Sequence, residues 1–143
     1  MPLPVMPAPM TSEPNAVISR MPTLLIVEDD AFILECAEMM ISDWGYTTLT
    51  ASDVDEAMKL IDAPQPIDGL MTDIRLKSAR QGGIDLAQRA VSARPALRVL
   101  YTTGSELTSQ IADGFVANAR FLQKPYTENL LQVALSKLFA GHA

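Results

Sequence analysis

The sequence predicts an α/β protein, a doubly wound five-stranded parallel sheet with five helices. Three observations support this fold class. Five short strand-like stretches alternate along the chain with segments of helical periodicity. The 143 residues, 48% of them hydrophobic, are enough for one domain with a core of its own. Four of the five strands also end on polar residues, at the edge where α/β sheets bind ligands.

The five predicted strands are short runs rich in β-branched and other apolar residues. They occupy residues 24–27, 46–50, 67–72, 97–102 and 120–123. Because helices separate them in sequence, the strands are expected to pair in parallel, with helices on both faces of the sheet.

The helices are predicted from apolar residues that recur every three to four positions. They occupy residues 31–42, 53–61, 83–93, 105–117 and 127–139. Asp30 and Thr127 are the expected N-caps of the first and last helices, since each can accept hydrogen bonds from the free N–H groups of the first turn. The fourth helix is the weakest prediction because Gly114 interrupts it.

Composition excludes several classes of protein. The net charge of −6 argues against nucleic-acid binding, which needs a basic face. No apolar run approaches the roughly 20 residues of a membrane span. The single cysteine, Cys36, is expected to fill space in the core, and it suggests a reducing compartment, the cytoplasm. The single histidine, His142, argues against a zinc site with several His ligands.

Residues 1–20 differ from the rest because prolines alternate with methionines and other small or apolar residues. We expect a flexible tail there, followed by one domain at 21–143, with Met21 as an alternative start of translation.

The strand ends carry the functional signal. Glu28 and Asp29 follow the first strand, Asp73 the third, Thr103 the fourth and Lys124 the fifth. Parallel strands bring their carboxyl ends together at one edge, so acids, a hydroxyl and an amine are expected to meet there. This combination suggests a site for Mg²⁺ and a phosphoryl group.

Four motifs resemble the receiver domain of bacterial two-component response regulators, over about residues 23–140. They are LIVEDD (25–30), MTDIRL (71–76), LYTTG (100–104) and FLQKPY (121–126). Asp73 lies 45 positions after Glu28, Thr103 lies 30 after Asp73, and Lys124 lies 21 after Thr103, as in that family. The resemblance implies a flavodoxin-like sheet of order 2-1-3-4-5, and it places this chain among stand-alone, chemotaxis-regulator-like receivers.

Chemistry assigns roles to these residues, and the resemblance implies the same ones. Asp73 would accept the phosphoryl group, Lys124 would pair with a phosphoryl oxygen, and the Thr103 hydroxyl would report phosphorylation. Mg²⁺ would lie between Glu28, Asp29 and Asp73. The family adds the backbone carbonyl of Arg75 as a metal ligand and a cis peptide bond before Pro125.

Several residues keep two interpretations. Asp30 assists the acidic pair or, as we prefer, caps the first helix, and Thr102 is expected to point into the core. Phe121 is a switch aromatic or ordinary core, and Tyr126 is expected to border the site as part of a partner face.

The segment after Asp73 departs from the family. Lys77 stands where many receivers have proline, and residues 77–83 appear about two residues longer than usual, as in receivers of hybrid kinases. With Arg75 and Arg80, the segment is basic. It is either a solvated loop or one that shields the acyl phosphate or contacts the kinase.

The sequence thus predicts a phosphoacceptor module rather than an enzyme, with no output domain. Its expected partners are a histidine kinase or histidine phosphotransfer protein and an unknown downstream protein. A homodimer formed on phosphorylation is a further possibility. The alternatives are a phosphate shuttle or sink and a magnesium-dependent phosphatase with an aspartyl-phosphate intermediate.

Overall fold

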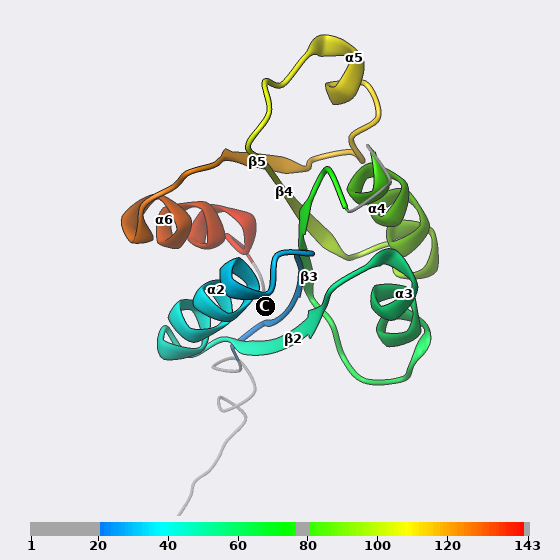
Figure 1. Cartoon of the computed structure of the whole chain (residues 1–143). Helices are drawn as coiled ribbons and strands as arrows, with labels where there is room; N and C mark the ends of the chain where they lie inside the picture. The colour runs from blue at the N-terminus through cyan, green and yellow to red at the C-terminus, as the bar shows by residue number, and fades with distance from the viewer. Residues whose placement is uncertain (1–20, 77–80, 142–143) are drawn as a thin grey trace, which may run out of the picture.

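A computed structural model of the protein describes residues 21–76 and 81–141 and contains one parallel five-stranded sheet (Figure 1). The strand order is β2-β1-β3-β4-β5. The predicted fold class and its flavodoxin-like order are therefore confirmed. The strands are β1 (Thr23–Val27), β2 (Thr47–Ala51), β3 (Gly69–Asp73), β4 (Arg98–Thr103) and β5 (Arg120–Gln123).

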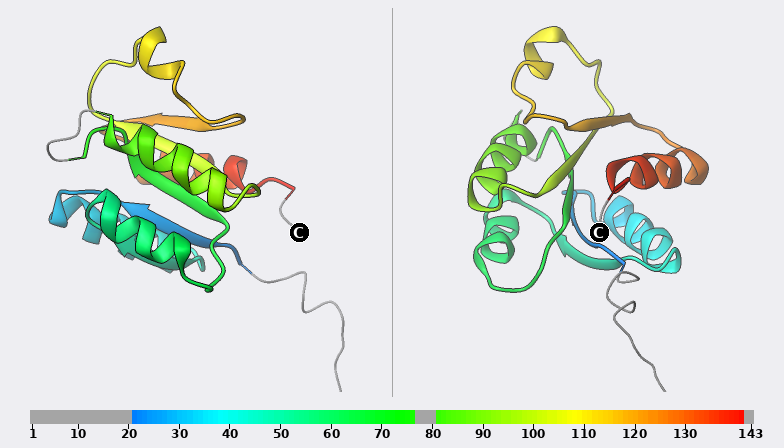
Figure 2. Two further views of the ribbon diagram at one scale, coloured as in Figure 1. Left: turned by 90° about the vertical axis from the view of Figure 1, so that its right-hand side faces the viewer. Right: turned by 180° about the vertical axis from the view of Figure 1, so that it is seen from behind.

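Helices cover both faces of the sheet, as Figures 1 and 2 show. Helices α2 (Ala31–Asp43) and α6 (Glu128–Leu138) lie on one face, and α3 (Val54–Asp62) and α4 (Gly82–Ala93) lie on the other. The short α5 (Ser109–Ala112) lies beyond β4 and β5 at the edge of the sheet. No helix of the described residues is long and apolar enough to cross a membrane.

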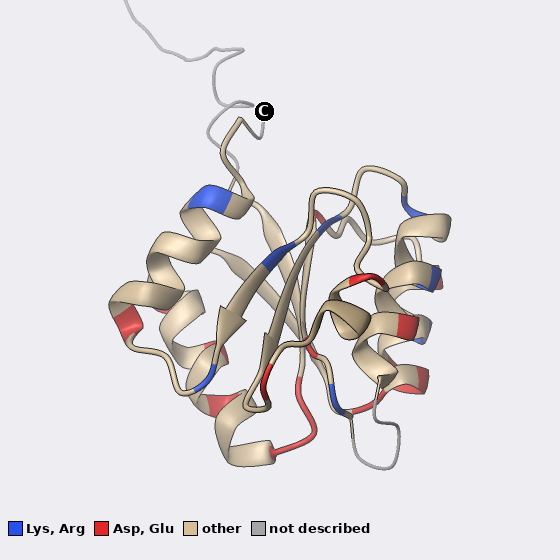
Figure 3. Cartoon of the chain, turned by 90° about the horizontal axis from the view of Figure 1, so that it is seen from above, with Lys and Arg blue, Asp and Glu red and all other residues tan. Residues whose placement is uncertain are grey.

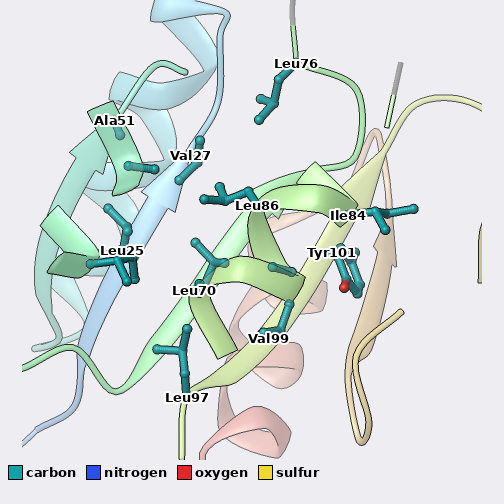
Figure 4. Packing of buried hydrophobic residues seen from close by; sticks show 14 of the residues in the cluster. Leu25, Val27, Ala51, Leu70, Leu76, Ile84, Leu86, Leu97, Val99 and Tyr101 are labelled. Carbon is teal, nitrogen blue, oxygen red and sulfur yellow. The ribbon is translucent and has the colours of Figure 1, made fainter. Parts of the chain in front are cut away.

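The core has two halves because successive side chains of a strand point to opposite faces. Leu25, Leu70 and Val99 pack with Leu86 under α3 and α4 (Figure 4). Their neighbours in sequence, such as Ile26 and Leu100, pack under α2 and α6. Burial on both faces explains why the central strands read as unbroken apolar runs.

The predicted N-caps are present. The Asp30 carboxylate accepts hydrogen bonds from the backbone N–H groups of Phe32 and Ile33, at 3.0 and 3.1 Å. The Thr127 hydroxyl accepts from the N–H of Leu130 at 3.1 Å. Asp30 therefore acts as the cap that we preferred, and this cap fixes where α2 begins next to the acidic motif.

The prediction of a helix over 105–117 was wrong in length, since α5 has four residues and none of them is buried. The apolar residues that suggested a longer helix pack on the sheet edge. The ring of Phe115 stacks on Tyr101 with centroids 4.1 Å apart, and the N–H of Val116 donates to the Tyr101 hydroxyl at 3.2 Å. These contacts and Gly114 keep the chain from continuing as a helix.

Some predictions fall outside the described residues. They concern the 1–20 tail, Lys77 and Arg80 of the long loop, and His142. The domain boundary at residue 21 stays a prediction.

Candidate functional site

The candidate site lies at the carboxyl edge of the sheet, where four strands end side by side. Asp73 is the last residue of β3 and pairs in register with Thr102 of β4. Thr103 is the last residue of β4 and lies beside Gln123 of β5. Glu28 directly follows β1, and Lys124 directly follows β5. The structure thus brings the predicted residues from distant parts of the sequence to one edge.

Three carboxylates lie close enough together to share a cation. Glu28, Asp29 and Asp73 each offer an oxygen, and these three oxygens lie within 4.8 Å of one another. Glu28 and Asp73 are only 6% and 8% exposed, whereas Asp29 is half-buried. Asp29 is thus the member of the cluster that is most accessible to solvent.

Lys124 joins two of these acids. Its ammonium nitrogen Nζ lies 2.6 Å from Oε1 of Glu28 and 3.3 Å from Oδ2 of Asp73. The peptide bond between Lys124 and Pro125 is cis, as the family resemblance implied. Among described residues, Lys124 supplies the only ammonium or guanidinium group within 4.0 Å of either acid.

Burial and charge act against each other at this site. Burial raises the pKa values of Glu28 and Asp73 above their ordinary values, although the Lys124 ammonium opposes both shifts. Burial alone would lower the pKa of Lys124, but its contacts with Glu28 and Asp73 raise it overall. Ionised carboxylates here are therefore short of compensating positive charge, a shortage that a divalent cation would relieve.

Thr103 is buried at the site, and its hydroxyl oxygen accepts a hydrogen bond from the Ser105 N–H at 3.1 Å. Its backbone carbonyl accepts from the Lys124 N–H at 2.9 Å and from the Gln123 side-chain amide at 3.0 Å. The segments after β4 and β5 are thus tied together. Sequence analysis did not single out Gln123, although its polar side chain within an apolar strand motif was a signal.

The backbone around Asp73 is held from both sides. Ile74 N–H donates to the Thr102 carbonyl at 2.8 Å, and Gly83 N–H donates to the Ile74 carbonyl at 2.8 Å. A Cβ at position 83 would overlap the Asp73 carbonyl oxygen, so only glycine fits there. Sequence analysis missed this role of Gly83, although the adjacent pair of glycines at 82 and 83 was a signal.

The other predicted residues occupy defined positions. Thr102 is buried, as predicted. The backbone N–H of Arg75 hydrogen-bonds the Asp73 carboxylate and lowers its pKa, while the Arg75 side chain is exposed. The proposed role of the Arg75 carbonyl as a metal ligand stays a prediction. Phe121 is half-buried and packs near Phe115, with ring centroids 6.3 Å apart.

A mainly apolar hollow of about 440 Å³ adjoins the site between α2 and the segment after β5. Lys124 and Tyr126 line it, so Tyr126 does border the site. Phe32, which also lines it, is 73% exposed. Cys36 is half-buried on the wall of this hollow, which corrects its expected place in the core. It faces outward because α2 turns Ala37 and Ile41 toward the sheet.

Family comparison agrees with this geometry. The family model of the response regulator receiver domain matches residues 24–136. This range includes every strand but the first residue of β1, and all residues of the candidate site. The chain therefore belongs to the response regulator receiver domain family.

Solved receivers have the same fold. A response regulator receiver protein from Sinorhizobium medicae has a TM-score of 0.74 and 28% identity, over 82% of this chain and 94% of that one. The non-phosphorylated HemR receiver domain from Leptospira biflexa has a TM-score of 0.73 and 27% identity, over 83% and 94% of the two chains.

Curated relatives are longer proteins. The alginate biosynthesis transcriptional regulatory protein AlgB of Pseudomonas aeruginosa is 33% identical over 80% of this chain and 25% of its own length. The response regulator MprA of Mycobacterium ulcerans is 31% identical over 76% of this chain and 46% of its own. The match thus spans at most about half the length of either relative.

Proposed function

We propose that this protein is a phosphorelay response regulator that accepts a phosphoryl group on Asp73. The observation that carries the proposal is the grouping of a buried aspartate, two further acids and a lysine at one strand edge. Asp73 ends a central strand and its backbone is held by hydrogen bonds, so its carboxylate is positioned before any donor arrives.

The transfer moves one phosphoryl group between two proteins. An oxygen of the Asp73 carboxylate attacks the phosphorus of a phosphohistidine on a histidine kinase or phosphotransfer protein. The new P–O bond forms as the P–N bond breaks, and the departing imidazole nitrogen keeps the electron pair and takes a proton from solvent. The product is an acyl phosphate on Asp73, which water later hydrolyses.

The acids fit Mg²⁺, because that ion prefers oxygen ligands and all three carboxylates can supply one. Glu28, Asp29 and Asp73 would hold it, with the Arg75 carbonyl as a fourth ligand. When bound, the ion would screen negative charge on the nucleophile and on the phosphoryl oxygens. Lys124 would move from its contact with Glu28 toward the phosphoryl group, and the Thr103 hydroxyl would donate to another phosphoryl oxygen.

The donor protein would dock beside Asp73 on the hollow that Phe32 and Tyr126 line. An exposed aromatic at the rim of an apolar hollow is a common anchor for a partner protein. The phosphorylated protein would then bind an unknown target or a second copy of the chain, through a surface that includes Phe121. We place the protein in the cytoplasm, where histidine kinases present their phosphorylated domains.

A phosphate shuttle or sink would use the same chemistry and differ only in the next acceptor. A phosphatase would instead turn over free phosphomonoesters. Incubation with Mg²⁺ and phosphoramidate, followed by intact mass, should show one added phosphoryl group that EDTA prevents. Sustained hydrolysis of p-nitrophenyl phosphate at enzyme-like rates, without an accumulating phosphoprotein, would favour the phosphatase.

A further inference from the structure

A second hollow lies at the other end of the sheet and gathers positive charge. Its volume is about 530 Å³, within the range of small-molecule sites. Arg98 at the start of β4, Arg120 at the start of β5 and Lys137 in the last turn of α6 all line it. No Asp or Glu is among the described residues of its wall. This is unusual for a chain with a net charge of −6.

The three cations have no acidic partner in the described chain. Among residues 21–76 and 81–141, no carboxylate lies within 4.0 Å of Arg98, Arg120 or Lys137. Figure 3 shows basic residues on two adjacent strands, whereas acidic residues lie in loops at the opposite edge and on the helices. Three like charges around one hollow repel each other, and a bound anion would remove that repulsion.

One of the cations is fixed in place. The Nη1 of Arg98 donates to the backbone carbonyls of Leu138 and Ala140, at 3.0 and 2.9 Å. These two bonds use one nitrogen of the guanidinium, so the hydrogens on the other two remain for a ligand. Arg120 and Lys137 are exposed and can turn into the hollow. A guanidinium held in position suits the oxygens of a phosphate group.

The wall also has an apolar part. Val91, Pro95 and Leu138 are among the residues that form it. A ligand that satisfies both parts would carry phosphate at one end and an apolar ring or chain at the other. Simple inorganic anions would use only the charged part.

We propose that this hollow, defined by Arg98, Arg120 and Lys137, binds a small organic phosphate of the nucleotide class. The site is separate from Asp73, because Asp73 pairs with Thr102, four residues beyond Arg98 on β4. At about 3.3 Å per residue, the two sites are roughly 13 Å apart along the strand. The proposal therefore does not depend on phosphorylation of Asp73.

The test is an NMR titration of the whole chain with ADP, pyrophosphate and adenosine in EDTA, which keeps divalent cations from the acidic site. We expect ADP to bind saturably, with amide shifts at residues 96–99, 117–120 and 137–140. Pyrophosphate should bind more weakly at the same residues, and adenosine should not bind. Higher salt should weaken ADP binding.

Variants at the exposed cations Arg120 and Lys137 complete the test. Arg120→Gln and Lys137→Gln should each weaken ADP binding by about ten-fold, the loss of one charge-assisted contact. Arg89→Gln, an exposed cation of α4 outside the hollow, should leave binding unchanged.

Three results would overturn the proposal. They are no saturable shift at millimolar ADP, shifts centred on the acidic site, or equal weakening by Arg89→Gln. A single-stranded oligonucleotide that binds far more tightly than ADP, with shifts spread beyond the hollow, would also contradict a small-molecule site.

Discussion

Lys124 lies nearer to Glu28 than to Asp73, with Nζ–O distances of 2.6 and 3.3 Å. The lysine therefore compensates two buried acids at once in the absence of a phosphoryl group. A phosphoryl group on Asp73 would add negative charge on one side of Lys124 and draw the ammonium away from Glu28. The same side chain would thus stabilise both forms of the site.

Replacing Lys124 should impair both forms. Lys124→Ala leaves two buried carboxylates without their cation, and we expect it to lower the free energy of unfolding by about 1–3 kcal/mol. It should also reduce phosphoryl transfer to Asp73. Urea unfolding and intact mass measure the two effects. Lys59→Ala, at an exposed position of α3, is the control, and an equal loss in that variant would contradict a specific role for Lys124.

Asp29 is expected to contribute to Mg²⁺ binding and to lower the stability of the metal-free protein. Asp29→Ala should lose most Mg²⁺ affinity, because one of three carboxylate ligands is gone. Without Mg²⁺ it should melt at a higher temperature, because repulsion with Asp73 is removed. Calorimetric titration and thermal unfolding test this, with exposed Asp43→Ala as the control. Unchanged Mg²⁺ affinity in the Asp29 variant would refute this ligand assignment.

Gly83 should be required for the position of Asp73. Gly83→Ala forces a methyl group against the Asp73 carbonyl. We expect it to lower the free energy of unfolding by about 1–3 kcal/mol and to slow phosphate uptake. Gly104→Ala is a matched control beside the site, since a Cβ there meets nothing within 4 Å. If both variants behave alike, the close packing of Gly83 has no special effect.

Substitutions of Thr103 and Lys124 should have different effects on phosphorylation and on the response to it. Thr103→Ala removes one hydrogen bond, worth up to roughly 3 kcal/mol with a charged partner, and should still accept phosphate. It should lose the response of the surface formed by α5, β5 and α6, where Phe121 lies. Amide exchange with and without beryllofluoride measures that response, and Thr103→Ser should retain it. A response in Thr103→Ala equal to that of the unchanged protein would exclude Thr103 as the switch.

The sequence predicted the sheet well, and it predicted that the polar residues at the strand ends would lie together, because both depend on local pattern. Short apolar runs between helical segments identify the strands, and parallel strands bring their carboxyl ends to one edge, so the amino-acid sequence alone is enough to group Glu28, Asp73 and Lys124. The length of α5 could not be predicted, because it depends on tertiary contacts. The ring of Phe115 stacks on Tyr101, and the backbone N–H of Val116 donates to the Tyr101 hydroxyl. The fit of Gly83 on Asp73 likewise depends on how close two backbones come, which no sequence pattern records.

Intact mass of Asp73→Asn beside the unchanged protein, after treatment with Mg²⁺ and phosphoramidate, tests the central claim most directly. Asparagine keeps the size of the side chain but removes the nucleophilic carboxylate. We expect one phosphoryl group, about 80 Da, on the unchanged protein and none on Asp73→Asn. Stoichiometric phosphorylation of Asp73→Asn would contradict the assignment of Asp73 as the phosphoacceptor.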